Sequence, residues 1–186
     1  MRLNVMNRSV KIILFVVLAA VLAVPSAVNS QDVATGSATA TVLTALAVSS
    51  VAALVFGNIY QGVATTIANN NAAAGIYAIT GQGSAGIAIY MALPEYVALA
   101  DGSDRMTIAF STTDASVDSL GGGDPTAMAG ASGWQDTNPH SFPSATVIGS
   151  GGTTNIYLGG KITPTINQTA GAYTGDIVLT VAYNGN

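Results

Sequence analysis

The sequence has 186 residues, of which 49% are hydrophobic and only 8% are charged, and it contains no cysteine. Without cysteine there can be no disulfide, no thiolate metal ligand and no cysteine nucleophile. After residue 30 the only basic residues are Arg105 and Lys161, against nine acidic residues, and this excludes a nucleic-acid partner because phosphate binding needs clustered basic side chains.

Residues 1–30 have the pattern of a secretory signal peptide. Three basic residues stand before an apolar run at residues 12–24: Arg2, Arg8 and Lys11. The run is too short to cross a bilayer as a helix, which takes about 20 residues. We therefore expect cleavage that leaves Gln31 as the first residue, secretion of the product, and no attachment to the membrane afterwards.

From residue 34 to residue 48, small apolar side chains alternate with Thr and Ser. This period of two predicts a strand. Residues 45–54 are rich in Ala and also fit one helical turn. Further strand-like runs follow, separated by turns rich in Gly, Asn and Asp, at residues 63–68, 76–80, 86–91, 96–100, 106–111, 145–148, 155–162 and 177–183.

The last of these runs is the clearest. Ile177, Leu179, Val181 and Tyr183 share one face, and polar residues lie on the other, so one face is expected in a core and one in water. Many short strands with turn signals, and no segment of helical period, predict an all-β antiparallel sandwich. Residues 31–186 are short enough to form a single domain around one core.

Residues 111–144 are predicted to form one long loop, because they are rich in Gly, Ser, Asp and Pro. Loops of this length inside a compact domain are usually functional or mobile. The only tryptophan lies here, and Trp134, His140 and Phe142 form either a binding tip or a set of contacts that hold the loop against the sandwich.

No set of residues predicts catalysis. A serine hydrolase needs a base beside its nucleophile, and the single histidine, His140, lies in a Pro-flanked loop. The pairs Asp101 with Asp104 and Asp114 with Asp118 are formally compatible with a glycosidase, but aspartate in such turns more often caps backbone groups. We therefore predict no enzyme, no catalytic, cofactor-binding or metal-binding residue, and no cofactor.

Several short motifs follow one another along the chain: residues 38–42 (Ala-Thr-Ala-Thr-Val), 54–59 (Leu-Val-Phe-Gly-Asn-Ile), 158–160 (Leu-Gly-Gly), 171–175 (Gly-Ala-Tyr-Thr-Gly) and 181–184 (Val-Ala-Tyr-Asn). Together they resemble an uncharacterised family of secreted bacterial domains that is similar to fimbrial, pilin-type subunits. The resemblance spans residues 34–184 and implies an immunoglobulin-like or pilin-like β-sandwich in the periplasm or at the cell surface. The insertion at 111–144 and the absence of a disulfide depart from the pilin pattern.

The resemblance also implies partners. In fimbrial subunits an incomplete sandwich is completed by an extended N-terminal segment of the next subunit. Residues 31–41 fit such a donor, because they alternate, carry small side chains and have no charge after Asp32. They are equally suited to form the first strand of their own domain. The implied partners are other copies or related surface subunits, with a periplasmic chaperone as a further candidate.

Two functions follow from these observations. The first is an exported structural subunit or adhesin of a fimbria-like bacterial surface assembly, joined by β-strand pairing. The alternative is a secreted β-sandwich module that does not polymerise and binds a glycan or a protein through residues 111–144.

Overall fold

The computed structural model describes residues 33–185, and these fall into two units that meet between Ala40 and Thr41. In the first unit, residues 33–40 are exposed and form no helix or strand. In the second unit, residues 41–46 also lack regular structure, and the first strand begins at Ala47. The strand predicted from residue 34 is therefore wrong before Ala47. Its small side chains offer little apolar area to bury, so alternation alone does not fix it to a sheet.

The signal peptide predicted over residues 1–30 lies outside the described residues. Among the helices of the described part, none has the length and hydropathy needed to cross a membrane.

From Ala47 to residue 185 the structure contains twelve strands and one short helix. They are β1 (Ala47–Ala52), β2 (Thr65–Ile67), β3 (Gly75–Thr80), β4 (Ile87–Ala92), β5 (Tyr96–Leu99), β6 (Arg105–Ala109), β7 (Ala115–Asp118), α2 (Pro125–Met128), β8 (Trp134–Thr137), β9 (Thr153–Leu158), β10 (Gly160–Thr163), β11 (Tyr173–Thr174) and β12 (Val178–Tyr183).

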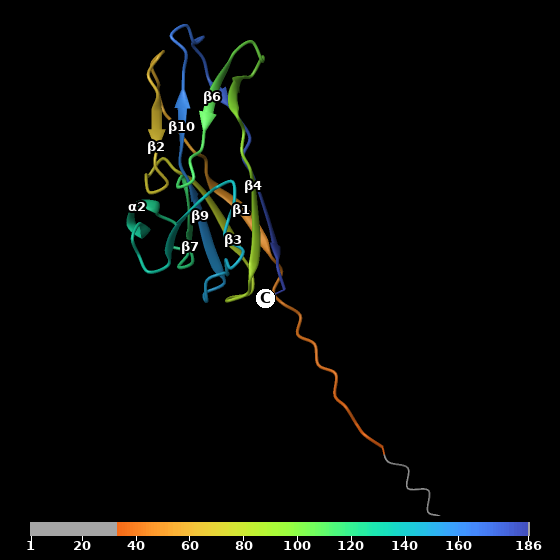
Figure 1. Cartoon of the computed structure of the whole chain (residues 1–186). Helices are drawn as coiled ribbons and strands as arrows, with labels where there is room; N and C mark the ends of the chain where they lie inside the picture. Colours follow the sequence, from red (N-terminus) through yellow and green to blue (C-terminus); the bar gives the residue numbers. More distant parts are fainter. Residues whose placement is uncertain (1–32, 186) are drawn as a thin grey trace, which may run out of the picture. The chain divides into compact units, whose positions relative to one another are not determined.

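The strands form three antiparallel sheets within the second unit (Figure 1). Sheet 1 has the order β1-β3-β9-β7-β8, sheet 2 the order β11-β5-β6-β10-β2, and sheet 3 contains only β12 and β4. Figure 1 shows β2, β10 and β6 at one end of this unit and β1, β3, β9 and β7 at the other. The prediction of an all-β antiparallel sandwich is confirmed.

At three places the chain passes from one sheet into another through a connection of three residues or fewer: from β4 to β5, from β9 to β10 and from β11 to β12. The second of these changes occurs at Gly159, which breaks the single strand predicted over residues 155–162. A Cβ at this position would lie 2.7 Å from the backbone nitrogen of Asn69 and 2.8 Å from the carbonyl carbon of Ala68. Only glycine allows the two backbones to approach this closely.

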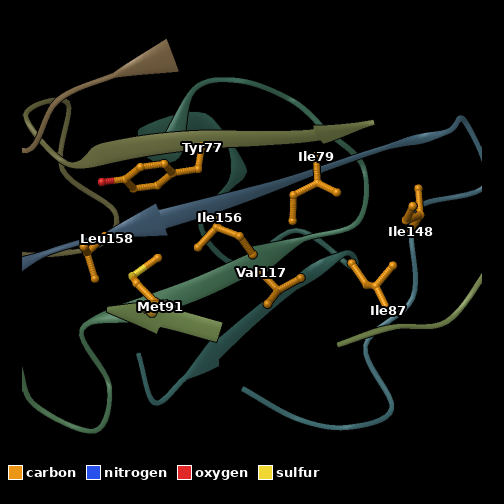
Figure 2. Packing of buried hydrophobic residues seen from close by; sticks show 9 residues of the cluster. Tyr77, Ile79, Ile87, Met91, Val117, Ile148, Ile156 and Leu158 are labelled. Atoms are coloured by element: carbon orange, nitrogen blue, oxygen red, sulfur yellow. The ribbon is translucent and has the colours of Figure 1, made fainter. Parts of the chain in front are cut away.

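The main core, which we call core 1, lies between sheets 1 and 3 (Figure 2). Tyr77, Ile79 and Ile156 project from sheet 1, and Ile87 and Met91 project from β4. On β12 the alternation is as predicted, since the half-buried residues Leu179, Val181 and Tyr183 pack against core 1 while the intervening side chains are exposed.

A second core, core 2, lies on the inner face of sheet 2. It consists of Val97, Met106, Ile108 and Ile162, which are all buried. The partly buried residues that cover it are Leu54, Phe56, Ile59, Phe110 and Tyr173, and among these only Tyr173 belongs to a strand. Sheet 2 therefore has no complete second layer in the described part of the chain.

The prediction that residues 111–144 form one loop is wrong. This segment contains β7, which is buried along its whole length and pairs with both β8 and β9 in sheet 1. Its polar residue Asp118 made it look like a turn. In the structure the Asp118 carboxylate accepts hydrogen bonds from the backbone N–H groups of Leu120 and Gly122, each at 2.8 Å, and from the Tyr157 hydroxyl at 3.2 Å. Conversely, the strand predicted at 145–148 is reduced to a single bridge between Val147 and Gly86.

Candidate functional site

An open groove with a volume of about 900 Å³ runs over the inner face of sheet 2. Its floor is core 2, with Val97 from β5, Met106 and Ile108 from β6, and Ile162 from β10. These side chains share one face because alternate residues of a strand point the same way. The floor is therefore apolar and contains no titratable side chain.

The first wall of the groove is formed by residues 53–61, which continue the chain from β1. Leu54, Phe56 and Ile59 turn toward core 2, whereas Val55 and Tyr60 are exposed. Val55 donates a backbone hydrogen bond to the carbonyl of Ala73 at 3.0 Å. Within the described residues, 56–59 make no backbone hydrogen bond at all. Leu54 and Phe56 alternate with Val55 as in a strand, but Gly57 has a φ of 69° and the chain bends at Asn58, so this wall is an irregular segment without a partner strand.

The second wall is formed by residues 168–175 and Ile177. Its strand, β11, pairs with β5 on one side and with no strand of the described chain on the other. Unpaired backbone groups at the edge of a sheet are a template for the addition of another strand.

A cluster of hydrogen bonds ties the two walls together at one end of the groove, which we call the Gln168 end. The Gln168 amide nitrogen donates to Asp104 Oδ2 at 2.8 Å and to the Tyr173 hydroxyl at 2.9 Å. The Gln61 amide nitrogen reaches the Gln168 carbonyl at 2.5 Å. Because Gln168 is 3% exposed, this polar side chain needs these partners.

Asp104 is the charged member of this cluster. Its Oδ2 accepts a hydrogen bond from the backbone N–H of Thr169 at 2.8 Å and one from the Tyr173 hydroxyl at 2.9 Å. The Thr169 N–H, followed by the Tyr173 hydroxyl, holds the pKa of Asp104 well below its usual range. Loss of solvation, followed by the hydrogen bond to Asp104 and the charge of Asp104, raises the pKa of Tyr173.

The groove offers an apolar floor with hydrogen-bonding edges on both sides. An extended peptide between the walls can pair with both edges and place alternate side chains on the floor, which is how strand addition gives affinity and specificity. The residues that line the groove include no His, Asp, Glu, Lys or Cys. Nor do any three or more His, Cys, Asp or Glu residues in the described chain lie close enough together to hold a metal ion.

The residues proposed for a binding tip at 111–144 do not come together at the groove. Trp134 stacks on Tyr157, and Phe142 packs against core 1. His140 is exposed, and its ring lies 3.2 Å from the carbonyl of Phe110. For Trp134 and Phe142 the structure supports the role of holding the segment against the sandwich.

The paired aspartates also have hydrogen-bond partners of their own. Asp101 accepts hydrogen bonds from the backbone and hydroxyl of Ser103, and these lower its pKa. Asp114 accepts the backbone N–H of Ser111 at 2.7 Å, and Asp118 is buried beneath Tyr157.

Comparison with known proteins adds no relative. No family model matches the sequence, and neither a curated protein nor a solved structure matches it. The resemblance to fimbrial domains therefore stays a prediction, and the function has to be argued from the groove.

Proposed function

We propose that the chain is an exported structural subunit or adhesin of a fimbria-like bacterial surface assembly whose molecules are joined by β-strand pairing. The observation that carries this proposal is the groove over sheet 2. Its floor is apolar, its volume is about 900 Å³, and the wall at residues 56–59 has no backbone hydrogen-bond partner in the described chain. Such a site is suited to an extended segment of a neighbouring molecule.

The N-terminal segment supports the same proposal. Residues 33–43 are exposed and belong to no strand, although their sequence alternates between small apolar residues and Thr or Ser. Ala34, Gly36, Ala38 and Ala40 share one face of such a segment when it is extended. The segment has the features of an added strand and, as described above, does not form the first strand of its own domain.

The alternative function, binding of a glycan or protein through residues 111–144, draws less support. The segment's only tryptophan covers the buried ring of Tyr157, and one of its strands lies inside sheet 1. Packing within the sandwich therefore explains the positions of this tryptophan and this strand.

The test compares chains that begin at residue 31 and at residue 42, by size-exclusion chromatography and negative-stain microscopy. We expect filaments or ladders from the first and a folded monomer from the second. A matched pair of charge substitutions controls for composition, since Ala38→Asp places the charge toward the apolar floor and Thr39→Asp places it toward solvent. Assembly should be lost with the first and kept with the second. A chain from residue 31 that stays monomeric at every concentration contradicts the proposal.

A further inference from the structure

The only lysine and the only arginine that the structure describes lie on one side of sheet 2. Arg105 on β6 and Lys161 on β10 are exposed, and each stands next to a residue of the groove floor, Met106 and Ile162. Because alternate residues of a strand point to opposite sides, both cations project from the side of sheet 2 that faces away from the groove. We call this side the outer face of sheet 2. It stays open when the groove is filled.

The two cations are one strand and four residues apart. Lys161 is paired with Ala109, the last residue of β6, whereas Arg105 is the first residue of that strand. Their backbone positions are therefore separated by about 14 Å at roughly 3.4 Å per residue. Thr107 lies between them on the same face, and it is paired with the exposed Thr163 of β10. The outer face thus carries two positive charges with hydroxyl groups between them.

An aromatic ring holds the Arg105 side chain. The guanidinium carbon lies 4.8 Å from the ring centroid of Tyr96, which belongs to the adjacent strand β5. Tyr96 is 46% exposed, and no other large apolar side chain in the strands of sheet 2 is exposed. A contact with a ring face uses none of the guanidinium N–H groups as hydrogen-bond donors, so they remain available to a ligand.

No carboxylate neutralises these cations. The strands of sheet 2 contain no Asp or Glu, and neither cation forms an ion pair within the described residues. Glu95 is exposed just before β5 but is paired with neither, and the Asp104 carboxylate, just before β6, accepts its hydrogen bonds from Thr169 and Tyr173 at the Gln168 end. The outer face therefore complements an anionic partner, although the chain as a whole is acidic.

The chemistry of the outer face favours a sugar chain over a protein or a nucleic acid. The buried centre of a protein interface is apolar, and this face offers Tyr96 alone as a large apolar side chain. A nucleic acid requires clustered cations, and here there are two, well apart. Threonine hydroxyls both donate and accept hydrogen bonds, as sugar hydroxyls do, and a guanidinium binds a carboxylate through two parallel hydrogen bonds.

We propose that the outer face of sheet 2 binds an acidic polysaccharide whose sugars carry carboxylate groups, with Arg105 and Lys161 each contacting one carboxylate. An extended chain with one carboxylate on each sugar can cross Thr107 and reach both cations. The site is separate from the groove and does not depend on the proposed assembly. It is available on a single molecule, and repeated copies along an assembly would strengthen binding through multivalency.

Binding of the full chain to immobilised polygalacturonate, with dextran as the neutral control, tests the proposal. We expect binding to polygalacturonate alone, and weaker binding as the salt concentration rises. Arg105→Gln and Lys161→Gln each remove one charge at an exposed position, so the fold should be kept. Each substitution should weaken binding about tenfold, which corresponds to the loss of one hydrogen-bonded charge contact.

A matched pair of substitutions controls for net charge. Thr107 and Thr180 are both exposed threonines within a strand, but Thr180 belongs to sheet 3. Thr107→Glu places a carboxylate between the two cations and should abolish binding. Thr180→Glu changes the net charge equally and should leave binding unchanged. Circular dichroism establishes that both variants are folded.

The results that would overturn the proposal are equally specific. Equal binding to dextran, or wild-type affinity in a variant that carries both Arg105→Gln and Lys161→Gln, would show that the cations do not recognise the ligand. Failure of the wild type to bind polygalacturonate would also overturn the proposal. If the oligomeric size of that protein then changed with Lys161→Gln, the outer face would be assigned to an acidic protein surface instead.

Discussion

The indole ring of Trp134 lies on the phenol ring of Tyr157, with the ring centroids 5.1 Å apart and the planes inclined by 17°. The Trp134 Nε1–H donates to Asp136 Oδ1 at 2.8 Å, and the same oxygen accepts the Asn69 amide at 2.9 Å. Tyr157 is completely buried. The single tryptophan therefore closes the outer face of sheet 1, and the glycine-rich segment that carries it is held in place by this stack.

We predict that Trp134→Ala lowers the free energy of unfolding by about 1–3 kcal/mol, because it removes a ring stack and uncovers Tyr157. Trp134→Phe keeps a ring over Tyr157 and should lose less. Urea denaturation followed by circular dichroism measures both. Equal stability of Trp134→Ala and the wild type would contradict the assigned packing role and return Trp134 to the list of binding residues.

Gly159 should not tolerate a side chain. Gly159→Ala places a Cβ 2.7 Å from the backbone nitrogen of Asn69 and against the carbonyl of Ile67, so either the turn or β10 has to move. The control is Gly151→Ala, where the new Cβ meets no atom within 4 Å. We expect Gly159→Ala to lower the melting temperature clearly. Gly151→Ala should change the free energy of unfolding by less than about 0.5 kcal/mol. Equal losses of stability for the two variants, measured by calorimetry, would contradict the close approach of the two backbones at Gly159.

Most strands could be predicted from the sequence because their alternation is local. Thr180 lies outside and Val181 inside, as the pattern of the last strand requires. The prediction from alternation was wrong where strand formation depends on residues that are distant in the sequence. Residues 34–46 alternate but pair with no strand of the described chain, whereas β7 carries one large apolar residue, Val117, and is nevertheless buried between β8 and β9.

The groove could not be predicted from the sequence. Met106 and Ile108 were assigned correctly to one strand, but their neighbours on the floor come from β5 and β10, and nothing local shows that sheet 2 lacks a second layer. Likewise, Gln168 belongs to no pattern, and its role depends on Asp104, 64 residues earlier.

The Asp104 cluster predicts a specific acid sensitivity. A carboxylate whose pKa is lowered on folding stabilises the native state above its unfolded pKa of about 3.9, and this contribution is lost as the pH falls through the folded pKa. Asp104→Asn should therefore lower the melting temperature at pH 7, and its difference from wild type should shrink as the pH falls below about 4. Asp176→Asn, at an exposed residue without a hydrogen bond among those described, is the control. A difference that stays constant down to pH 2 would show that the Asp104 charge does not stabilise the fold.

Substitutions that remove side-chain volume from core 1 should lower the free energy of unfolding. Ile156 is fully buried between sheets 1 and 3, so Ile156→Val should cost about 0.5–1.5 kcal/mol and Ile156→Ala about 2–5 kcal/mol. Ile166 is 77% exposed, and Ile166→Ala should cost less than about 0.5 kcal/mol. Chemical denaturation at one pH compares all three. Similar losses at the two positions would be inconsistent with the described core.

The central claim is that the groove over sheet 2 accepts a β-strand, and hydrogen exchange tests it most directly. The wild-type assembly is compared with the Ala38→Asp variant, which is expected to remain unassembled. We predict that the amides of residues 56–59 and of the second wall exchange much more slowly in the assembly, because they gain hydrogen bonds to the added strand. Unchanged exchange at both walls, with new protection along the edge strands β1 or β8 instead, would show that molecules join elsewhere and would contradict the account.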